Sequence, residues 1–245
     1  ESSGDGKNAN LVAQLETESL AAKAAEFKTT TNDDTIGWIR IPNTNVDYPV
    51  VYKAGVENYA YYESKGYDKQ YSKDGVIWAD YECTFPELSQ NTTLYGHNWH
   101  NIYTPRTQAN MQANDLMFSL VMSYNYTDFA QENPFVYFST TEQDYVFQVF
   151  ASYYTDLNFG YNYAQMSQED FQKVIAEAKA KSLSNYNVPV TSEDKIVTLS
   201  TCTRVHGNTN NQRFVVMAKL VPVGTPSTTI STHSNPIAYN SSIDA

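Results

Sequence analysis

The most informative residues of this chain are a cysteine, an arginine and a histidine, each at the end of a predicted strand. Cys202 closes the run Thr-Leu-Ser-Thr-Cys at 198–202, and Arg213 opens the next β-prone run. His97 directly follows Leu-Tyr-Gly at 94–96. A thiol attacks a carbonyl group as the thiolate, and a nearby cation or imidazolium raises the thiolate fraction. These three residue types together suit nucleophilic acyl chemistry.

The three side chains divide the expected work between them. Cys202 supplies the nucleophile, and His97 supplies a group that exchanges protons near neutrality, because the ordinary imidazole pKa is about 6.5. Arg213 cannot act as a base, since its pKa exceeds ~12, but it can donate hydrogen bonds to an oxyanion. If the last two strands pair as a hairpin, Arg213 lies across from Cys202. Ser200 then shares one strand face with Cys202.

Other interpretations of Cys202 stay open at this point. It could be a small core residue, or it could form a disulfide with Cys83, the second of the two cysteines. A zinc site could nominally draw on one thiol and three imidazoles: Cys202, His206, His97 and His100. Paired cysteine motifs are absent, however, and Arg213 would oppose a divalent ion. We therefore expect no metal and no cofactor.

Composition narrows the class of protein. The 245 residues carry a formal net charge of -11, which leaves no basic stripe for nucleic acid or for direct binding to anionic lipid. The 20 tyrosines against 5 methionines favour strands over a helical bundle. No apolar run reaches the ~20 residues of a membrane span. The Ser- and Gly-rich start suggests a trimmed extracellular domain, so we expect any anchor or signal to lie outside this sequence.

The spacing of apolar residues predicts a mainly β fold. Strands are predicted at 36–41, 46–51, 76–79, 92–95, 134–139, 144–154, 194–201 and 212–221. About eight strands without regular strand–helix alternation favour a closed or nearly closed barrel over a doubly wound sheet.

Helices are expected around and between these strands. One is predicted at 8–27, one or two short ones at 116–131, and the clearest at 167–182, where Ser167 is a plausible N-cap. We expect a linker and helix at 1–31 and one domain at 32–223. A Ser- and Thr-rich, loosely attached tail is expected at 224–245.

The motifs at 94–97 and 198–202, together with Arg213, resemble those of sortases, the cysteine transpeptidases that attach surface proteins to the Gram-positive cell wall. The likeness covers roughly 35–221. The N-terminal helix and the long helix at 167–182 resemble the class B branch in particular. The resemblance implies an eight-stranded sortase-type β-barrel, with that long helix between the sixth and seventh strands.

The resemblance also implies an activity. Cys202, with His97 and Arg213, would cleave a C-terminal sorting signal of the Asn-Pro-x-Thr type after threonine and hold the protein as a thioester. An amine in a peptidoglycan precursor or on a pilin would accept the protein, at the outer face of a Gram-positive membrane. Six further positions are implied as substrate contacts: Ser200, Thr203 through its backbone N–H, Asn58, Tyr62, Thr155 and Tyr161.

Some features depart from the family pattern, and other functions stay open. The polar and aromatic stretch at 98–114 is longer than the connection expected there, and the tail extends past the last expected strand. A hydrolytic, papain-like cysteine peptidase is disfavoured, because such a nucleophile opens a helix and precedes its histidine. A catalytically silent surface-binding domain remains possible, since sequence does not show that the three side chains converge.

Overall fold

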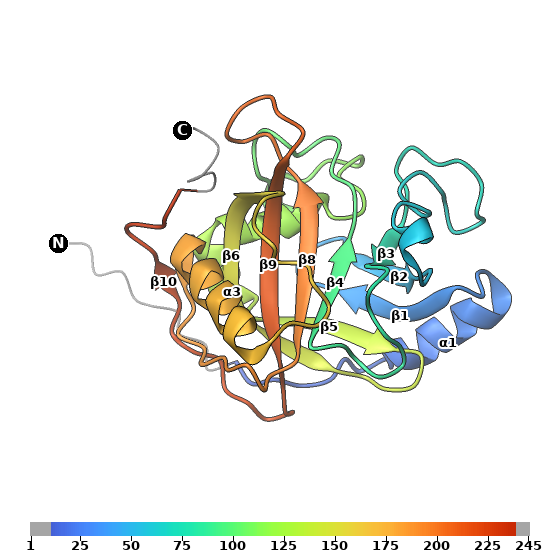
Figure 1. Ribbon diagram of the computed structural model, residues 1–245, viewed down its shortest axis with the longest axis horizontal. Coiled ribbons are helices and arrows are strands. Elements are labelled where there is room, and N and C mark those ends of the chain that lie inside the picture. The colour runs from blue at the N-terminus through green and yellow to red at the C-terminus, as the bar shows by residue number, and fades with distance from the viewer. Residues whose placement is uncertain (1–10, 239–245) are drawn as a thin grey trace.

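A closed barrel of eight strands forms the centre of the computed structural model, which describes residues 11–238 (Figure 1). Its strands lie in the order β1-β2-β3-β4-β8-β9-β6-β5. The strands are β1 (Thr35–Arg40), β2 (Asp47–Val51), β3 (Ile77–Ala79), β4 (Asn91–Tyr95), β5 (Phe135–Thr140), β6 (Val146–Asp156), β8 (Ile196–Cys202) and β9 (Gln212–Val221). This arrangement confirms the predicted barrel.

The pairing of β4, β8 and β9 sets the position of the site. β4 runs parallel to β8, with Leu94 opposite Leu199, whereas β9 runs antiparallel to β8. Parallel neighbours end at the same edge of a sheet, so the residue that closes β8 and the residues that follow β4 emerge together. The antiparallel return brings the start of β9 to that edge as well. All three segments therefore meet at one mouth of the barrel.

A continuous apolar core fixes this register. Ile39, Leu94, Leu199 and Phe147 come from four different strands, and each is 0% exposed. Burial of such a side chain contributes about 1.5–3 kcal/mol. A shift of one residue along β8 would turn its core side chains outward, so the core holds the strand ends in place.

The first helix begins later than predicted. α1 spans Leu20–Thr30, and the Ser19 side chain accepts a hydrogen bond of 3.1 Å from the backbone N–H of Ala22. The prediction of a helix from residue 8 was wrong over 11–18, and residues 8–10 lie outside the described part. The segment before Ser19 is extended because it pairs with the chain after β9: Ala13 donates its N–H to the Thr225 carbonyl at 2.8 Å.

The remaining helices follow the predictions more closely. α3 (Gln168–Lys181) begins at the predicted Ser167 cap and packs Phe171 and Ile175 inward across β6 (Figure 1). The predicted pair at 116–131 forms as a 3₁₀ helix, η3, and a short α-helix, α2. The short elements are η1 (Val56–Asn58), η2 (Gln108–Asn110), η3 (Ser119–Asn125) and α2 (Thr127–Glu132).

The chain after residue 223 is packed, so the prediction of a loosely attached tail was wrong for its described part. β10 (Ser231–Thr232) pairs with β7 (Ser184–Asn185), and Ile230 is 4% exposed. Gly224 donates its N–H to the Ala13 carbonyl at 2.7 Å. Backbone hydrogen bonds hold this segment, which is why its polar side chains gave no periodic signal. Residues 239–245 lie outside the described part.

Candidate active site

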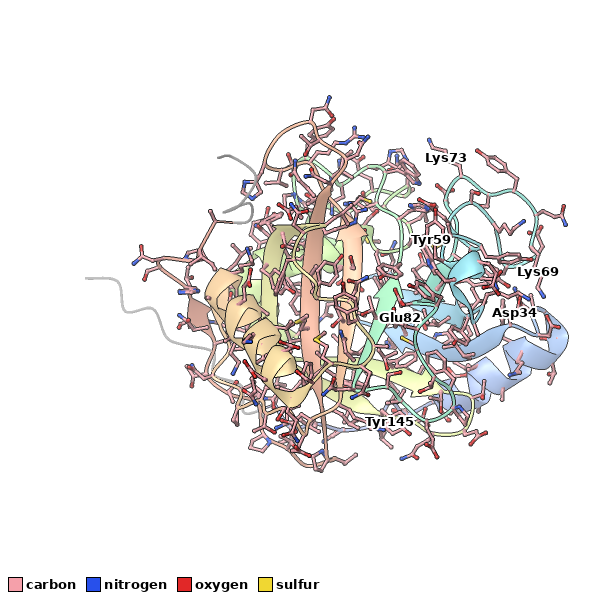
Figure 2. The ribbon with its side chains drawn as sticks, viewed as in Figure 1. Asp34, Tyr59, Lys69, Lys73, Glu82 and Tyr145 are labelled. Atoms are coloured by element: carbon pink, nitrogen blue, oxygen red, sulfur yellow. The ribbon has the colours of Figure 1, made fainter. Side chains whose placement is uncertain are left out.

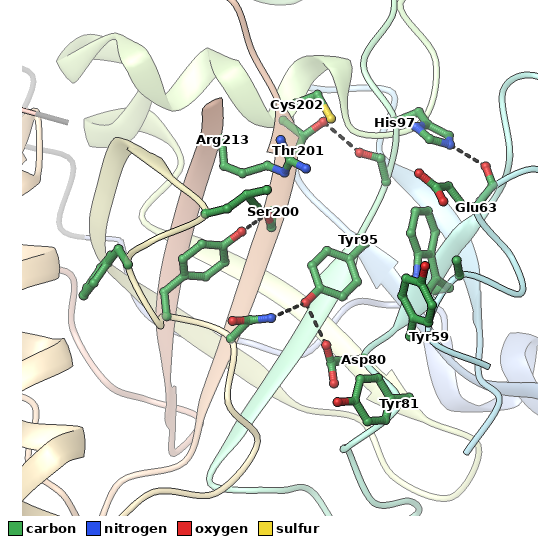
Figure 3. A pocket seen from close by; sticks show the side chains of 17 residues that line it. Tyr59, Glu63, Asp80, Tyr81, Tyr95, His97, Ser200, Thr201, Cys202 and Arg213 are labelled. Atoms are coloured by element: carbon green, nitrogen blue, oxygen red, sulfur yellow. Dashed lines mark hydrogen bonds between the residues drawn. The ribbon is translucent and has the colours of Figure 1, made fainter. Parts of the chain in front are cut away.

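A pocket of about 300 Å³ lies at the mouth of the barrel where β4 and β8 end (Figure 3). Four parts of the chain form its walls: the loop between β2 and β3, residues of β3 and of the end of β4 with those that directly follow each strand, the loop after β6, and the adjoining ends of β8 and β9. Cys202, His97 and Arg213 all line it. The structure thus brings the three predicted catalytic side chains to one cavity.

Cys202 is the last residue of β8 and is partly exposed to the pocket. Its backbone carbonyl accepts a hydrogen bond of 3.3 Å from the Asn98 amide, and the preceding Thr201 donates its hydroxyl to the Gly96 carbonyl at 2.7 Å. Both bonds tie the end of β8 to the segment after β4. The thiol is therefore held on a rigid strand end with open space before it.

His97 is fixed through its Nε2 atom. Nε2 lies 2.5 Å from the backbone carbonyl oxygen of Glu63, in the loop between β2 and β3 (Figure 3). A carbonyl can only accept, so Nε2 carries the proton and the lone pair of the neutral ring lies on Nδ1. The rings of Trp78 and Trp99 also contact the imidazole, with centroids 5.7 and 5.1 Å away from its own. The imidazole is thereby oriented for proton exchange through Nδ1.

Arg213 is the second residue of β9 and lies opposite Cys202 in the strand register. Its Nη1 donates to the carbonyl of Asn210 at 3.0 Å and to that of Gln212 at 2.9 Å. These two bonds use one nitrogen of a guanidinium that has five N–H donors. The donors on the other nitrogens can serve an oxygen that bears negative charge in the pocket.

Hydrogen bonds between side chains order the pocket floor. The hydroxyls of Tyr161 and Ser200 lie 2.8 Å apart, and burial raises the pKa of Tyr161. Tyr95 donates its hydroxyl to Asp80 at 2.7 Å and accepts from the Asn162 amide at 2.9 Å (Figure 3). Burial raises the pKa of Asp80. The loop after β6 is thus tied to both β8 and β4.

Two of the six positions implied as substrate contacts line the pocket, namely Ser200 and Tyr161. Thr203 does not line the pocket, and its backbone N–H is already used, because it donates to the Gln212 carbonyl at 3.4 Å. Thr155 is 0% exposed and lies opposite Arg213 in the register of β6 and β9.

The other two positions lie in the loop between β2 and β3, outside the pocket wall. Tyr62 is 1% exposed and donates its hydroxyl to the Asp34 carboxylate at 2.5 Å, so it anchors the loop. Asn58 donates its side-chain amide to the Ala54 carbonyl at 2.7 Å. Neighbours of these two residues, Tyr59 and Glu63, reach the pocket instead.

Several residues that line the pocket were not predicted from the sequence. Tyr95 lies inside the quoted motif at 94–97, and its parallel pairing with Ser200 could have placed it beside the nucleophile. Asp80 lies directly after the strand predicted at 76–79, whereas Glu63 lies in an irregular loop without any periodic pattern. Only the folded loop shows that Glu63 lies beside His97.

The disulfide and zinc interpretations find no counterpart in the described residues. Both cysteines are free, and burial raises the pKa of Cys83, which is 2% exposed, to about 12. Across residues 11–238, no group of three or more histidine, cysteine, aspartate or glutamate side chains could hold a metal ion. His206 packs its ring against Tyr154, where burial lowers its pKa.

Comparison with known proteins places the chain among its relatives. Residues 39–221 match the family model of the sortase domain. Sortase B of Staphylococcus aureus is 30% identical over 193 residues, which are 78% of this chain and 72% of that protein. Sortase B of Listeria monocytogenes is 29% identical over 191 residues, 78% of this chain and 71% of that protein.

Solved structures agree with this placement. The Staphylococcus aureus sortase B–substrate complex superposes with a TM-score of 0.68 at 27% identity, covering 84% of this chain and 88% of that one. Clostridium perfringens sortase B superposes with a TM-score of 0.66 at 27% identity, covering 80% and 98%.

A thiol, an imidazole and a guanidinium lie around one pocket of this closed β-barrel, and these are the groups that thiol-dependent acyl transfer uses. This chain belongs to the sortase family, and its relatives are of class B. It is a cysteine transpeptidase of the kind that anchors proteins to the cell wall at the Gram-positive cell surface. Membership of this family decides against the two other functions considered from the sequence, a papain-like peptidase and a catalytically silent binding domain. None of the described helices has the length and hydropathy to span a membrane.

Proposed function

We propose that Cys202 is the nucleophile of this transpeptidase, His97 its general acid and base, and Arg213 its oxyanion stabiliser. The observation that supports this most directly is that all three line one pocket of about 300 Å³ at the end of β8. The register pair Cys202–Arg213 adds a donor next to the sulfur. The Nε2 contact of His97 leaves Nδ1 for proton exchange.

The proposed substrate is a surface protein with a C-terminal sorting signal of the Asn-Pro-x-Thr type. Class B relatives support this signal class. The pocket adds hydroxyls and aromatic rings that are already fixed, including the Tyr161–Ser200 pair, and such fixed groups bind a peptide at low entropic cost. Ser200 and Tyr161 are accordingly the proposed signal contacts, and Tyr62, Asn58, Thr203 and Thr155 act on the signal only through the elements they hold.

Acylation would proceed in two chemical events. The Cys202 thiolate adds to the threonine carbonyl carbon, and the resulting oxyanion accepts hydrogen bonds from Arg213. The tetrahedral intermediate then collapses as the peptide C–N bond breaks. The imidazolium of His97 gives its Nδ1 proton to the leaving amine. The products are a thioester on Cys202 and the released C-terminal fragment.

The second half-reaction would transfer the protein to an amine. The acceptor nitrogen attacks the thioester, an amide forms, and the sulfur of Cys202 leaves. We propose an amine of a peptidoglycan precursor or of a pilin subunit as the acceptor, at the outer face of the membrane. Water can replace the amine when none is present, and the thioester then hydrolyses.

A peptide assay tests this proposal. A fluorogenic Asn-Pro-x-Thr peptide should give slow hydrolysis alone and a new amide product when a primary amine is added. Mass spectrometry should find the acyl group on Cys202, and Cys202→Ala should abolish both products while thermal unfolding stays unchanged. Acceptor panels with a wall-precursor amine and a pilin lysine distinguish the two acceptors. A folded wild-type enzyme that forms no acyl adduct with any such peptide would refute the proposal.

A further inference from the structure

We propose that the Glu63 carboxylate binds the ammonium group of the incoming acceptor and delivers it to His97, so that the enzyme favours acceptors that are protonated at neutral pH. This inference rests on the proposed function, because it concerns the second half-reaction at the same pocket. It makes Glu63 a residue that determines acceptor specificity, a role that no sequence pattern indicates.

The position of Glu63 carries the argument. Its backbone carbonyl accepts the hydrogen bond from His97 Nε2, and its side chain lines the same pocket as Cys202. Figure 3 shows the Glu63 side chain just below the His97 ring and directed into the cavity. Within residues 11–238, no hydrogen bond or ion pair engages this exposed carboxylate. It is therefore available to a ligand.

The charges of the pocket are separated along its width. Arg213 lies on the side of Cys202, and Glu63 lies across from it on the side of His97 (Figure 3). The other carboxylate of the lining, Asp80, is 7% exposed and already accepts bonds from Tyr95 and from the Glu82 N–H. An acyl oxygen is thus attracted to one side of the pocket and a cation to the other.

Neighbouring aromatic rings suit the same ligand. Tyr59, 69% exposed, and Trp78 line the same pocket as Glu63. Ring faces attract alkylammonium groups, with the strongest effect at tryptophan. A pocket wall that holds both a carboxylate and aromatic rings fits a primary ammonium on a flexible chain better than it fits water or a neutral nucleophile.

Binding of the ammonium at Glu63 would assist the proton transfer that must precede attack on the thioester. A lysine amine has a pKa of about 10.4 and an α-amine one of about 7.7–8.0, so most acceptors arrive protonated. The ammonium must lose one proton before its lone pair can attack the thioester, and Nδ1 of neutral His97 is the adjacent acceptor for that proton. A second proton leaves as the amide forms. Cys202 recovers one of the two protons as its thiol, and the other passes to solvent.

A comparison of two nucleophiles tests the proposal. Transpeptidation is measured at pH 7 with Nα-acetyl-lysine amide, which is cationic, and with hydroxylamine, which is neutral, in wild type, Glu63→Gln and Glu57→Gln. The Glu63→Gln substitution is isosteric and keeps the backbone carbonyl that orients His97. Glu57 is exposed on the same loop but does not line the pocket, so it controls for the loss of one negative charge.

The expected result is a rise of about 3- to 5-fold in KM for the lysine acceptor in Glu63→Gln, with a smaller change for hydroxylamine. Glu57→Gln should keep the wild-type ratio of the two KM values. Added salt should raise the lysine KM of wild type and not that of the variant. An unchanged ratio in Glu63→Gln, with the acyl-enzyme still forming, overturns this inference alone. Absence of the acyl-enzyme in wild type overturns it together with the proposed function.

Discussion

Cys202 and Arg213 face each other as register partners, one the last residue of β8 and the other the second residue of β9. The two residues are eleven positions apart in the chain, and the loop between them turns the chain back at the pocket. Because Arg213 also donates Nη1 to the carbonyls of Asn210 and Gln212, its head group is held by its own turn. Strand pairing thus places Arg213 opposite Cys202, and the two turn carbonyls hold its guanidinium.

Replacing Arg213 by lysine tests the value of the planar guanidinium. Lysine keeps the charge, but it has no rigid fork of donors that could hold the turn with one nitrogen and an oxyanion with another. We expect Arg213→Lys to lower the turnover of a signal peptide by about 10²-fold, the scale for loss of an oxyanion donor. Steady-state kinetics with the fluorogenic peptide measure it.

Arg204→Lys is the matched control for that variant. Arg204 lies in the same turn, where it donates to Asn210 at 2.8 Å, but it does not line the pocket. Its replacement should leave turnover within about 2-fold, as for a surface substitution. Equal effects of the two lysine variants would show that the turn, rather than the donor at the pocket, matters.

The two thiols should differ sharply in reactivity. Cys83 is only 2% exposed, and this burial raises the pKa of its thiol to about 12. The thiol therefore stays protonated and shielded from reagents through pH 9. Iodoacetamide should therefore add one carboxamidomethyl group per native chain between pH 7 and 9, located at Cys202 by peptide mapping. A second group should appear only in denaturant. Rapid labelling of Cys83 in the native protein would contradict its burial.

The Asp34 carboxylate should stabilise the loop that carries Glu63. Asp34 accepts from Tyr62 at 2.5 Å and pairs with Lys53 at 3.2 Å and Lys69 at 3.1 Å; Figure 2 shows Asp34 and Lys69 on one side of the molecule. Burial alone raises the pKa of Asp34, but these hydrogen bonds outweigh it and hold the pKa below its ordinary 3.8. Asp34→Asn should lower the free energy of unfolding by about 1–3 kcal/mol at pH 7.

The pH dependence of that loss gives a second check. A carboxyl whose folded pKa is depressed contributes stability above its unfolded pKa, and this contribution disappears as pH falls through the folded pKa. The difference between wild type and Asp34→Asn should thus be full at pH 5–7 and shrink below about pH 3.8. Asp33→Asn removes the adjacent, largely exposed carboxylate and should change stability little. Urea titrations over this pH range measure both variants.

The sequence predicted the strands and the three proposed catalytic side chains because both leave local signals. The runs of β8 and β9 are β-branched, and their hairpin places Arg213 opposite Cys202 without any distant information. Glu63 reaches His97 only because the loop between β2 and β3 folds over the end of β4, which no periodicity encodes. The same holds for Gly224 and Ala13, whose backbone pairing turns a polar tail into packed structure.

Gly75 shows how closely that loop packs on the imidazole. Its φ of +63° is unfavourable for other residues, and a Cβ there would lie 2.9 Å from His97 Cδ2 and 3.2 Å from the Glu63 carbonyl oxygen. Gly75→Ala should therefore cost about 1–2 kcal/mol in backbone strain and also push apart the pair that orients His97. We expect turnover to fall about 10-fold, which is less than the ~10²–10⁴-fold that general acid–base catalysis contributes in full, because the imidazole is displaced rather than removed.

Gly224→Ala separates strain from contact. Gly224 also has a positive φ, +94°, but nothing lies within 4 Å of a Cβ placed there. It should lose similar stability while its turnover stays near wild type, since the tail is remote from His97. Thermal unfolding and kinetics on both alanine variants decide the matter: equal losses of turnover at equal losses of stability would mean that backbone strain, and not displacement of His97, explains the effect at Gly75.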